Sequence, residues 1–103
     1  MASPRMNKRR SQLRAAYNIS EEDYEAMASV QEGMCAICDG EDERKRADGT
    51  PYPLSVDHDH SDGRVRGLLC NRCNAGLGMF REDIDALQRA IEYLKLYTKR
   101  RPV

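Results

Sequence analysis

The cysteines constrain the fold of this chain more than any other feature of its sequence. All four occur in two pairs, each with a gap of two residues: Cys35-Ala-Ile-Cys38 and Cys70-Asn-Arg-Cys73. This gap lets both sulfurs of a tight turn face one ion, and two such turns supply a tetrahedral set of four thiolates. Soft thiolates favour zinc, with iron as the main competitor. Four protein ligands leave no open position, so we expect this ion to hold the fold and to take no part in chemistry.

The composition explains why we expect the fold to need a structural metal ion. The chain has 103 residues, no Trp and one Phe, and 33% of its residues are charged, so we expect one domain with a thin apolar core. A redox role would leave the second cysteine pair unexplained, and disulfides need an oxidising compartment. No segment has the apolar length of a membrane span or a secretory signal, so we expect a cytoplasmic protein. The Arg-rich start also leaves an organellar transit peptide open.

Charge is segregated along the chain although the formal net charge is zero. Residues 1–19 carry five bases and no acid, and residues 20–43 carry nine acids and no base. Bases follow at residues 44–46 and again from Arg64 onward. Such segregation predicts one basic face and one acidic face, and the basic face indicates a nucleic-acid partner. The alternative is a solvated basic tail followed by an ordinary acidic helix. We expect residues 1–16 to form a basic arm or helix and residues 17–103 to form a single domain.

Capping and periodicity predict the helices. Ser20 and Asp23 form a capping-box pattern, which predicts a helix from Glu21 to near Gly33. Residues 39–53 are charged and rich in Gly and Pro, which is typical of a loop. The further expected helices cover residues 8–17, a short stretch from residue 71 to Gly76 or Gly78, and residues 83–97. The last has an apolar stripe that suits either the core or a coiled-coil seam, and we expect the core, hence a monomer or weak homodimer. This stripe consists of Ile84, Leu87, Ile91 and Leu94.

A hairpin is predicted between the two cysteine pairs. Residues 54–60 read as a strand, Ser61-Asp62-Gly63 as a turn with Asp-Gly at its centre, and residues 64–66 as the start of the return strand. The first strand contains the run Val56-Asp57-His58-Asp59-His60, which holds both histidines of the chain. By the period of two, the two imidazoles share one strand face and the two carboxylates share the other.

These side chains suit phosphodiester hydrolysis. A histidine is a fitting general base for water near neutral pH, and a hard cation polarises the phosphate. Magnesium prefers oxygen ligands, and Asp57 and Asn74 offer a carboxylate and an amide oxygen. Asn74 follows Cys73 directly, so the zinc would fix its helix against the hairpin. Because Asp57 and His58 are adjacent, a regular strand would point them apart, and the hypothesis requires an irregular strand there. The alternative is a polar hairpin followed by a helix-start asparagine.

The run from Val56 to Gly78, VDHDHSDGRVRGLLCNRCNAGLG, resembles the phage recombination endonuclease VII family, within the HNH, ββα-metal or His-Me finger nucleases. The shared features are a DHDH run, a hairpin turn, an RGLLC-x-x-CN segment and an upstream CxxC, and the likeness covers roughly residues 17 to 97. The sequence departs from the founding member at Ser55, where that protein has a histidine.

The resemblance implies an α+β fold with a small zinc-stapled ββα-metal (HNH) core and flanking helices. It implies one structural Zn2+ per chain on Cys35, Cys38, Cys70 and Cys73. It also implies a catalytic Mg2+ or Mn2+ on Asp57 and Asn74, with His58 as general base and His60 assisting at the phosphate. We add four arginines as expected phosphate contacts, since a guanidinium fork suits that group. These are Arg66, Arg64, Arg9 and Arg10.

The expected function is therefore that of a metal-dependent DNA endonuclease acting on duplex or branched DNA, by nicking or by double-strand cleavage. The expected place is the cytoplasm of a phage-infected or prophage-bearing bacterial host. A non-catalytic zinc-ribbon module that binds nucleic acid or protein is the main alternative, but it leaves Asp57, His58 and Asn74 without a role. A nuclease acting on RNA is the third.

Overall fold

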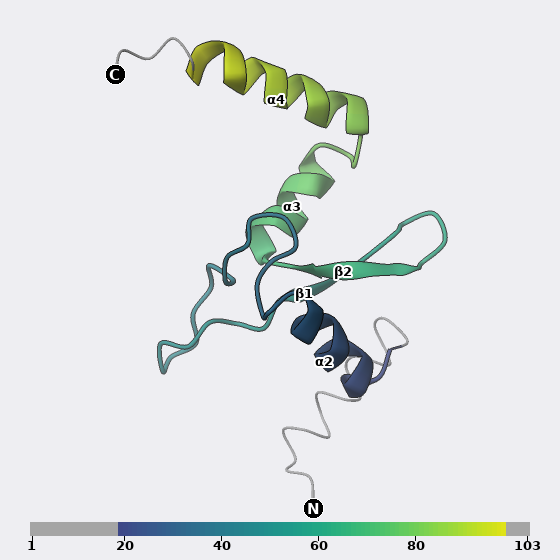
Figure 1. Cartoon of the computed structure of the whole chain (residues 1–103), viewed down its shortest axis with the longest axis vertical. Coiled ribbons are helices and arrows are strands. Elements are labelled where there is room, and N and C mark those ends of the chain that lie inside the picture. Colours follow the sequence, from purple (N-terminus) through teal and green to yellow (C-terminus); the bar gives the residue numbers. More distant parts are fainter. Residues whose placement is uncertain (1–18, 99–103) are drawn as a thin grey trace, which may run out of the picture.

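The computed structural model describes residues 19–98, a small α+β arrangement in which an antiparallel hairpin lies between helices (Figure 1). The predicted basic helix at residues 8–17 lies outside the described residues. Helix α2 (Glu21–Val30) begins where the capping box predicts: the Ser20 hydroxyl accepts from the Asp23 N–H at 2.9 Å, and the Asp23 carboxylate accepts from the Ser20 N–H at 3.2 Å. Gly33, with φ of 75°, follows the helix and donates its N–H to the Ala28 carbonyl at 2.8 Å.

The hairpin consists of β1 (Ser55–His58) and β2 (Val65–Leu69), joined by a turn in which Gly63 has φ of 76°. Two side chains of the α2 region attach to it. The Tyr24 hydroxyl donates to the carbonyl of Leu54, just before β1, at 2.6 Å. The Gln31 amide donates to the Leu68 carbonyl at 2.9 Å and accepts from the Leu68 N–H at 2.9 Å, as a neighbouring strand would. The hairpin is thereby fixed from the side of α2.

Helix α3 (Asn71–Met79) starts directly after β2 and packs against both strands. It passes through Gly76 and Gly78 and ends at Met79, slightly beyond the predicted end. The chain then leaves the helix through Arg81 and Glu82, which adopt left-handed conformations (φ 56° and 55°). The core among the described residues lies between α2, the hairpin and the start of α3. It consists of Ile19, Tyr24, Cys35, Leu54, Val56, Leu68, Leu69 and Cys70.

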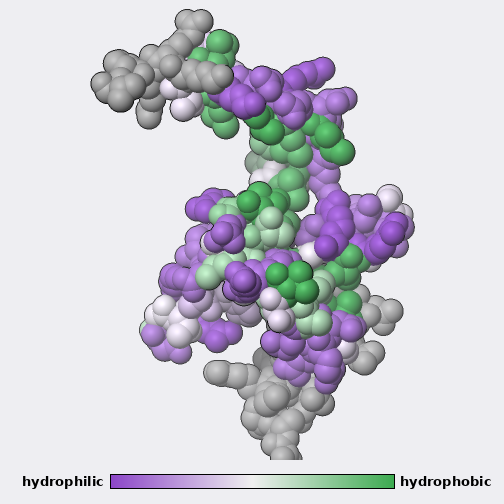
Figure 2. All heavy atoms as spheres, viewed as in Figure 1, coloured by the Kyte–Doolittle hydropathy of each residue, from purple (hydrophilic) through white to green (hydrophobic). Residues whose placement is uncertain are grey.

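Helix α4 (Ile84–Thr98) corrects the prediction that its apolar stripe serves the core. None of its residues is buried, and the side chains of Ile84 and Leu94 are 80% and 61% exposed. The turn at Arg81 and Glu82 directs α4 away from the hairpin (Figure 1), and apolar side chains lie exposed along it (Figure 2). Helical periodicity identified the apolar face correctly, but the thin core is filled by α2 and the hairpin instead.

Residues 39–53 form the predicted irregular loop, with one isolated bridge between Lys45 and Pro51. Across residues 19–98, every helix is too short or too polar to cross a bilayer.

Candidate functional site

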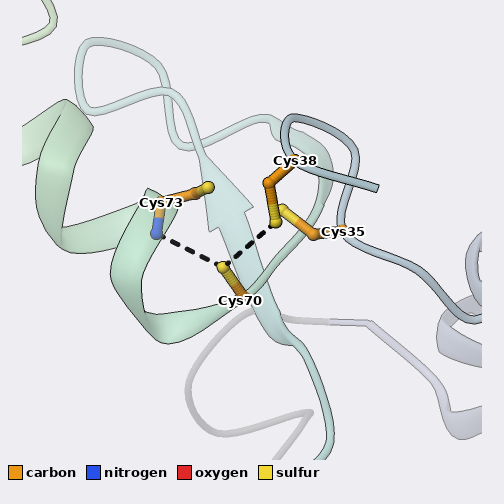
Figure 3. A group of neighbouring side chains, drawn as sticks. All are labelled: Cys35, Cys38, Cys70 and Cys73. Carbon is orange, nitrogen blue, oxygen red and sulfur yellow. Dashed lines mark hydrogen bonds between the residues drawn. The ribbon is translucent and has the colours of Figure 1, made fainter. Parts of the chain in front are cut away.

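The four cysteines converge at one point, although they come from two segments far apart in the sequence (Figure 3). Their sulfurs all lie within 4.8 Å of one another, and Cys38 Sγ is 3.8 Å from Cys70 Sγ. A zinc–sulfur distance of about 2.3 Å in a tetrahedron gives a sulfur–sulfur separation of about 3.8 Å. All four thiols are free of disulfides. The cluster therefore fits a single metal ion such as zinc.

The chemistry of the thiols favours a cation among them. Burial and the neighbouring thiols raise the pKa of Cys73 to about 12, and burial raises the pKa of Cys70. Burial also raises the pKa of Cys35, but backbone N–H groups, including that of Ile37 at 3.4 Å, outweigh it and bring that pKa to about 6. Four crowded sulfurs ionise together only when a cation compensates their charge. This is the donor set that a structural zinc requires.

Two acids hold the second cysteine pair in place from the loop after the first pair. Asp42, which is 1% exposed, accepts from the Asn71 N–H at 2.9 Å and from Arg44 through the Nε and Nη2 atoms. Glu43 accepts from the Arg72 N–H at 3.1 Å and from the Asn71 amide at 2.8 Å. Both carboxylates thus satisfy N–H groups in the first turn of α3, where negative charge is favourable. Sequence reasoning missed this pair because their partners lie 28 to 29 residues away.

The predicted catalytic run begins in β1 and continues past its end, and the strand is irregular there. The pairing register shifts between Asp57, which faces Gly67, and His58, which faces Val65. This bulge is the irregularity that the hypothesis required, since it changes how two adjacent side chains point. Asp57 is 9% exposed, whereas His58 is half-buried. The rings of His58 and His60 lie together, with centroids 4.9 Å apart, as the alternation predicted.

Arg66 on β2 lies against Asp57 rather than pointing freely into solvent. Its Nε and Nη2 atoms donate to the two Asp57 carboxylate oxygens at 2.7 and 3.1 Å, which is a bidentate pair. The same Nη2 atom donates to Glu82 at 2.5 Å, and the other Glu82 oxygen lies 2.9 Å from His60 Nε2. Glu82 is a residue that sequence reasoning missed.

The remaining predicted site residues lie nearby or outside the described residues. Asn74 is exposed on α3, the helix that packs against β1, so it and Asp57 stand on neighbouring elements. Arg64 is exposed and paired with Asp62 at 3.0 Å in the turn. Arg9 and Arg10 lie outside residues 19–98. Within those residues, the cysteines are the group of three or more Cys, His, Asp or Glu side chains that converge on one point.

Comparison with known proteins finds one family and two phage relatives. The model of the recombination endonuclease VII family matches residues 10–96, most of the chain. The gene 59 protein of Mycobacterium phage D29 is 48% identical over 86 residues, which cover 82% of this chain and 48% of that protein. The gene 59 protein of Mycobacterium phage L5 is 45% identical over 85 residues, with the same two shares.

These matches define a chain of the recombination endonuclease type, built on a cysteine cluster and a hairpin followed by a helix. The chain belongs to the recombination endonuclease VII family. It spans about half the length of the two phage relatives.

Proposed function

We propose that this protein is a metal-dependent DNA endonuclease of the HNH, ββα-metal type. The observation that carries the proposal is the register shift between Asp57 and His58, which interrupts the regular alternation of the strand where the His58 and His60 rings lie 4.9 Å apart. Family membership and the order of hairpin and helix support it. A regular strand would have placed the carboxylate and the imidazole on opposite faces, where they would serve different sides of the sheet.

Each residue has a separate task in this proposal. His58 takes the proton from the attacking water, and His60 lies 4.9 Å from it, ring to ring, close enough to contact the same phosphate. Asp57 and Asn74 would hold a Mg2+ or Mn2+ ion, since carboxylate and amide oxygens are ligands that such hard cations prefer. When bound, that ion would polarise the phosphate and stabilise the leaving oxygen.

The cysteine cluster would hold one zinc ion that fixes α3, and with it Asn74, against the hairpin. The acids Asp42 and Glu43 support the same junction. Arg64 in the hairpin, and Arg9 and Arg10 in the N-terminal arm, are proposed to contact DNA phosphates. Arg66 donates to Asp57 and Glu82 through Nε and Nη2, so its proposed phosphate contact would be made through Nη1. We propose a monomer or a weak homodimer, and the exposed stripe on α4 is the surface through which a weak dimer would form.

The test is a cleavage assay with the purified, zinc-loaded protein. Supercoiled plasmid and a structured RNA are incubated with it, with and without added Mg2+. We expect relaxed or linear plasmid when Mg2+ is present and intact RNA throughout. Cleavage of RNA alone would identify a ribonuclease. Binding of the plasmid without any cleavage, at any divalent ion tested, would identify a non-catalytic zinc-ribbon module.

A further inference from the structure

Glu82 links the end of α3 to both strands of the hairpin. One oxygen of its carboxylate accepts from Arg66 on β2, and the other lies 2.9 Å from the Nε2 atom of His60, which follows β1. Arg66 also donates two hydrogen bonds to the Asp57 carboxylate. Four side chains therefore form one continuous row: Asp57, Arg66, Glu82 and His60. The Glu82 side chain is 24% exposed, whereas that of His60 is 70% exposed. Glu82 is therefore the better fixed member of their pair.

The backbone also holds Glu82 in place. Its N–H donates to the Leu77 carbonyl at 2.8 Å, and its φ is 55°, in the left-handed region that a residue with a side chain seldom adopts. Such a conformation costs free energy and persists where surrounding contacts favour it. Here it lets the carboxylate turn back from the helix end toward the hairpin.

We propose that Glu82 is a positioning residue for DNA cleavage and that it acts through His60. This rests on the proposed function. An ionised carboxylate has no proton to donate, so the hydrogen of this contact lies on Nε2 of the imidazole. Glu82 thereby fixes both the orientation of the ring and which nitrogen carries the hydrogen, and Nδ1 remains the acceptor of the neutral ring. Arg66 in turn keeps the Glu82 carboxylate at a set place relative to Asp57. Without Glu82, an imidazole this exposed is free to rotate and to exchange its hydrogen between the nitrogens.

The first experiment measures kcat and KM for plasmid cleavage by Glu82→Ala, with Asp85→Ala as matched control. Asp85 is an exposed acid in the first turn of α4, so its removal changes the net charge equally. We expect Glu82→Ala to lower kcat by about 10- to 100-fold with little change in KM, as orienting partners typically do. Glu82→Gln should lie between it and the parent, because an amide has one oxygen and cannot accept from both partners. The control should match the parent. Equal activity of Glu82→Ala and the parent would overturn the proposal.

The second experiment separates positioning from a loss of structure. In a His60→Ala background, Glu82→Ala should cost less than about 2-fold in kcat, since the ring through which it acts is already absent. The same loss in both backgrounds would show that Glu82 does not act through His60.

The third measurement needs no activity. Long-range 15N NMR of the imidazoles should show the hydrogen of neutral His60 on Nε2 in the parent and in Asp85→Ala, and a mixture of both forms in Glu82→Ala. Unchanged His60 signals in Glu82→Ala would refute the proposal. If the parent cleaves nothing but these signals shift as expected, the proposed nuclease function has failed, and the contact between Glu82 and His60 stands without it.

Discussion

The cysteine cluster and the row from Asp57 to His60 differ in how their charges are compensated. At the cluster, four sulfurs crowd together, and the pKa values of Cys70 and Cys73 are raised, so the charge of ionised thiols there suits a cation from outside the chain. Along the row, the Arg66 guanidinium lies between the Asp57 and Glu82 carboxylates, and the other Glu82 oxygen contacts His60, so the chain itself supplies the partners of both acids. The cluster thus offers a donor set for a metal ion, whereas the row is held together by hydrogen bonds and ion pairs between its own side chains.

The largest expected effect is at the cluster. Cys70→Ser removes one ligand and the side chain that caps α3, where Cys70 Sγ accepts from the Cys73 N–H at 3.4 Å. Structural zinc contributes about 10 kcal/mol to folding in small peptide models, so we expect loss of both the zinc and the folded state. Metal analysis of the parent should give close to one zinc per chain, and circular dichroism should show Cys70→Ser unfolded. A Cys70→Ser variant that folds normally without zinc would contradict the proposal that the cysteine cluster stabilises the fold through a bound ion.

The second effect concerns the proposed divalent ion. Asn74 is exposed, so Asn74→Ala should keep the fold and the zinc. Mutating an outer-shell partner of a metal ligand costs about 10- to 100-fold in metal affinity or activity, and a ligand should cost at least as much. Cleavage in Mg2+ should therefore fall by at least about 10-fold and recover in part with excess Mn2+. Plasmid cleavage across a titration of each ion measures this. Full activity of Asn74→Ala at low Mg2+ would remove Asn74 from the proposed site.

A smaller effect is expected where the loop supports α3. The Arg44 guanidinium, against the cost of burial and with help from backbone N–H groups, lowers the pKa of Asp42 to about 2, from an ordinary value of 3.8. A lowered pKa contributes stability that is complete above the ordinary pKa and is lost as the pH falls toward the folded value. Because Arg44 is partly exposed, we expect Asp42→Asn to lower the unfolding free energy by about 1 to 2 kcal/mol at neutral pH.

Urea unfolding of zinc-loaded protein measures this difference, with the exposed Glu41→Gln as control. The difference should stay constant between about pH 8 and pH 6, since both pKa values of Asp42 lie well below that range. A difference that shrinks within this range would contradict the assignment of its cause.

The smallest effect concerns the N-terminal arm, which lies outside the described residues. Deleting residues 1–14 removes five positive charges. If each contacts a phosphate, the slope of log affinity against log salt falls by about 4 to 5, at about 0.9 per contact on duplex DNA. Filter binding or fluorescence anisotropy at several salt concentrations gives this slope. An unchanged slope would mean that the arm is a solvated tail.

The elements that sequence predicted well depend on residues close together in the chain. The spacing within each cysteine pair, the Ser20–Asp23 capping box and the Asp62-Gly63 turn are local patterns, and the structure has all three features. The bulge at Asp57 and His58 was inferred from what the chemistry requires, and the structure contains it.

What could not be predicted depends on distant contacts. Glu82 lies 16 residues from Arg66, and no spacing rule connects an acid at a helix end with an arginine on a strand. Periodicity likewise showed that α4 has an apolar face, but it could not show that this face stays exposed. The direction of α4 depends on the turn at Arg81 and Glu82. The bond from Arg66 to Asp57 was missed because a guanidinium suits a phosphate and a carboxylate equally well.

The most direct test of the account is a comparison of His58→Ala with the parent in three assays on the same preparations: zinc content, DNA binding and plasmid cleavage in Mg2+. Because the proposed role of His58 is water activation alone, the variant should keep one zinc per chain and bind DNA as the parent does. Its cleavage should fall by about 100- to 10,000-fold, the range that general-base catalysis contributes. Cleavage by His58→Ala at the parent's rate would contradict the assignment of the hairpin as the catalytic region.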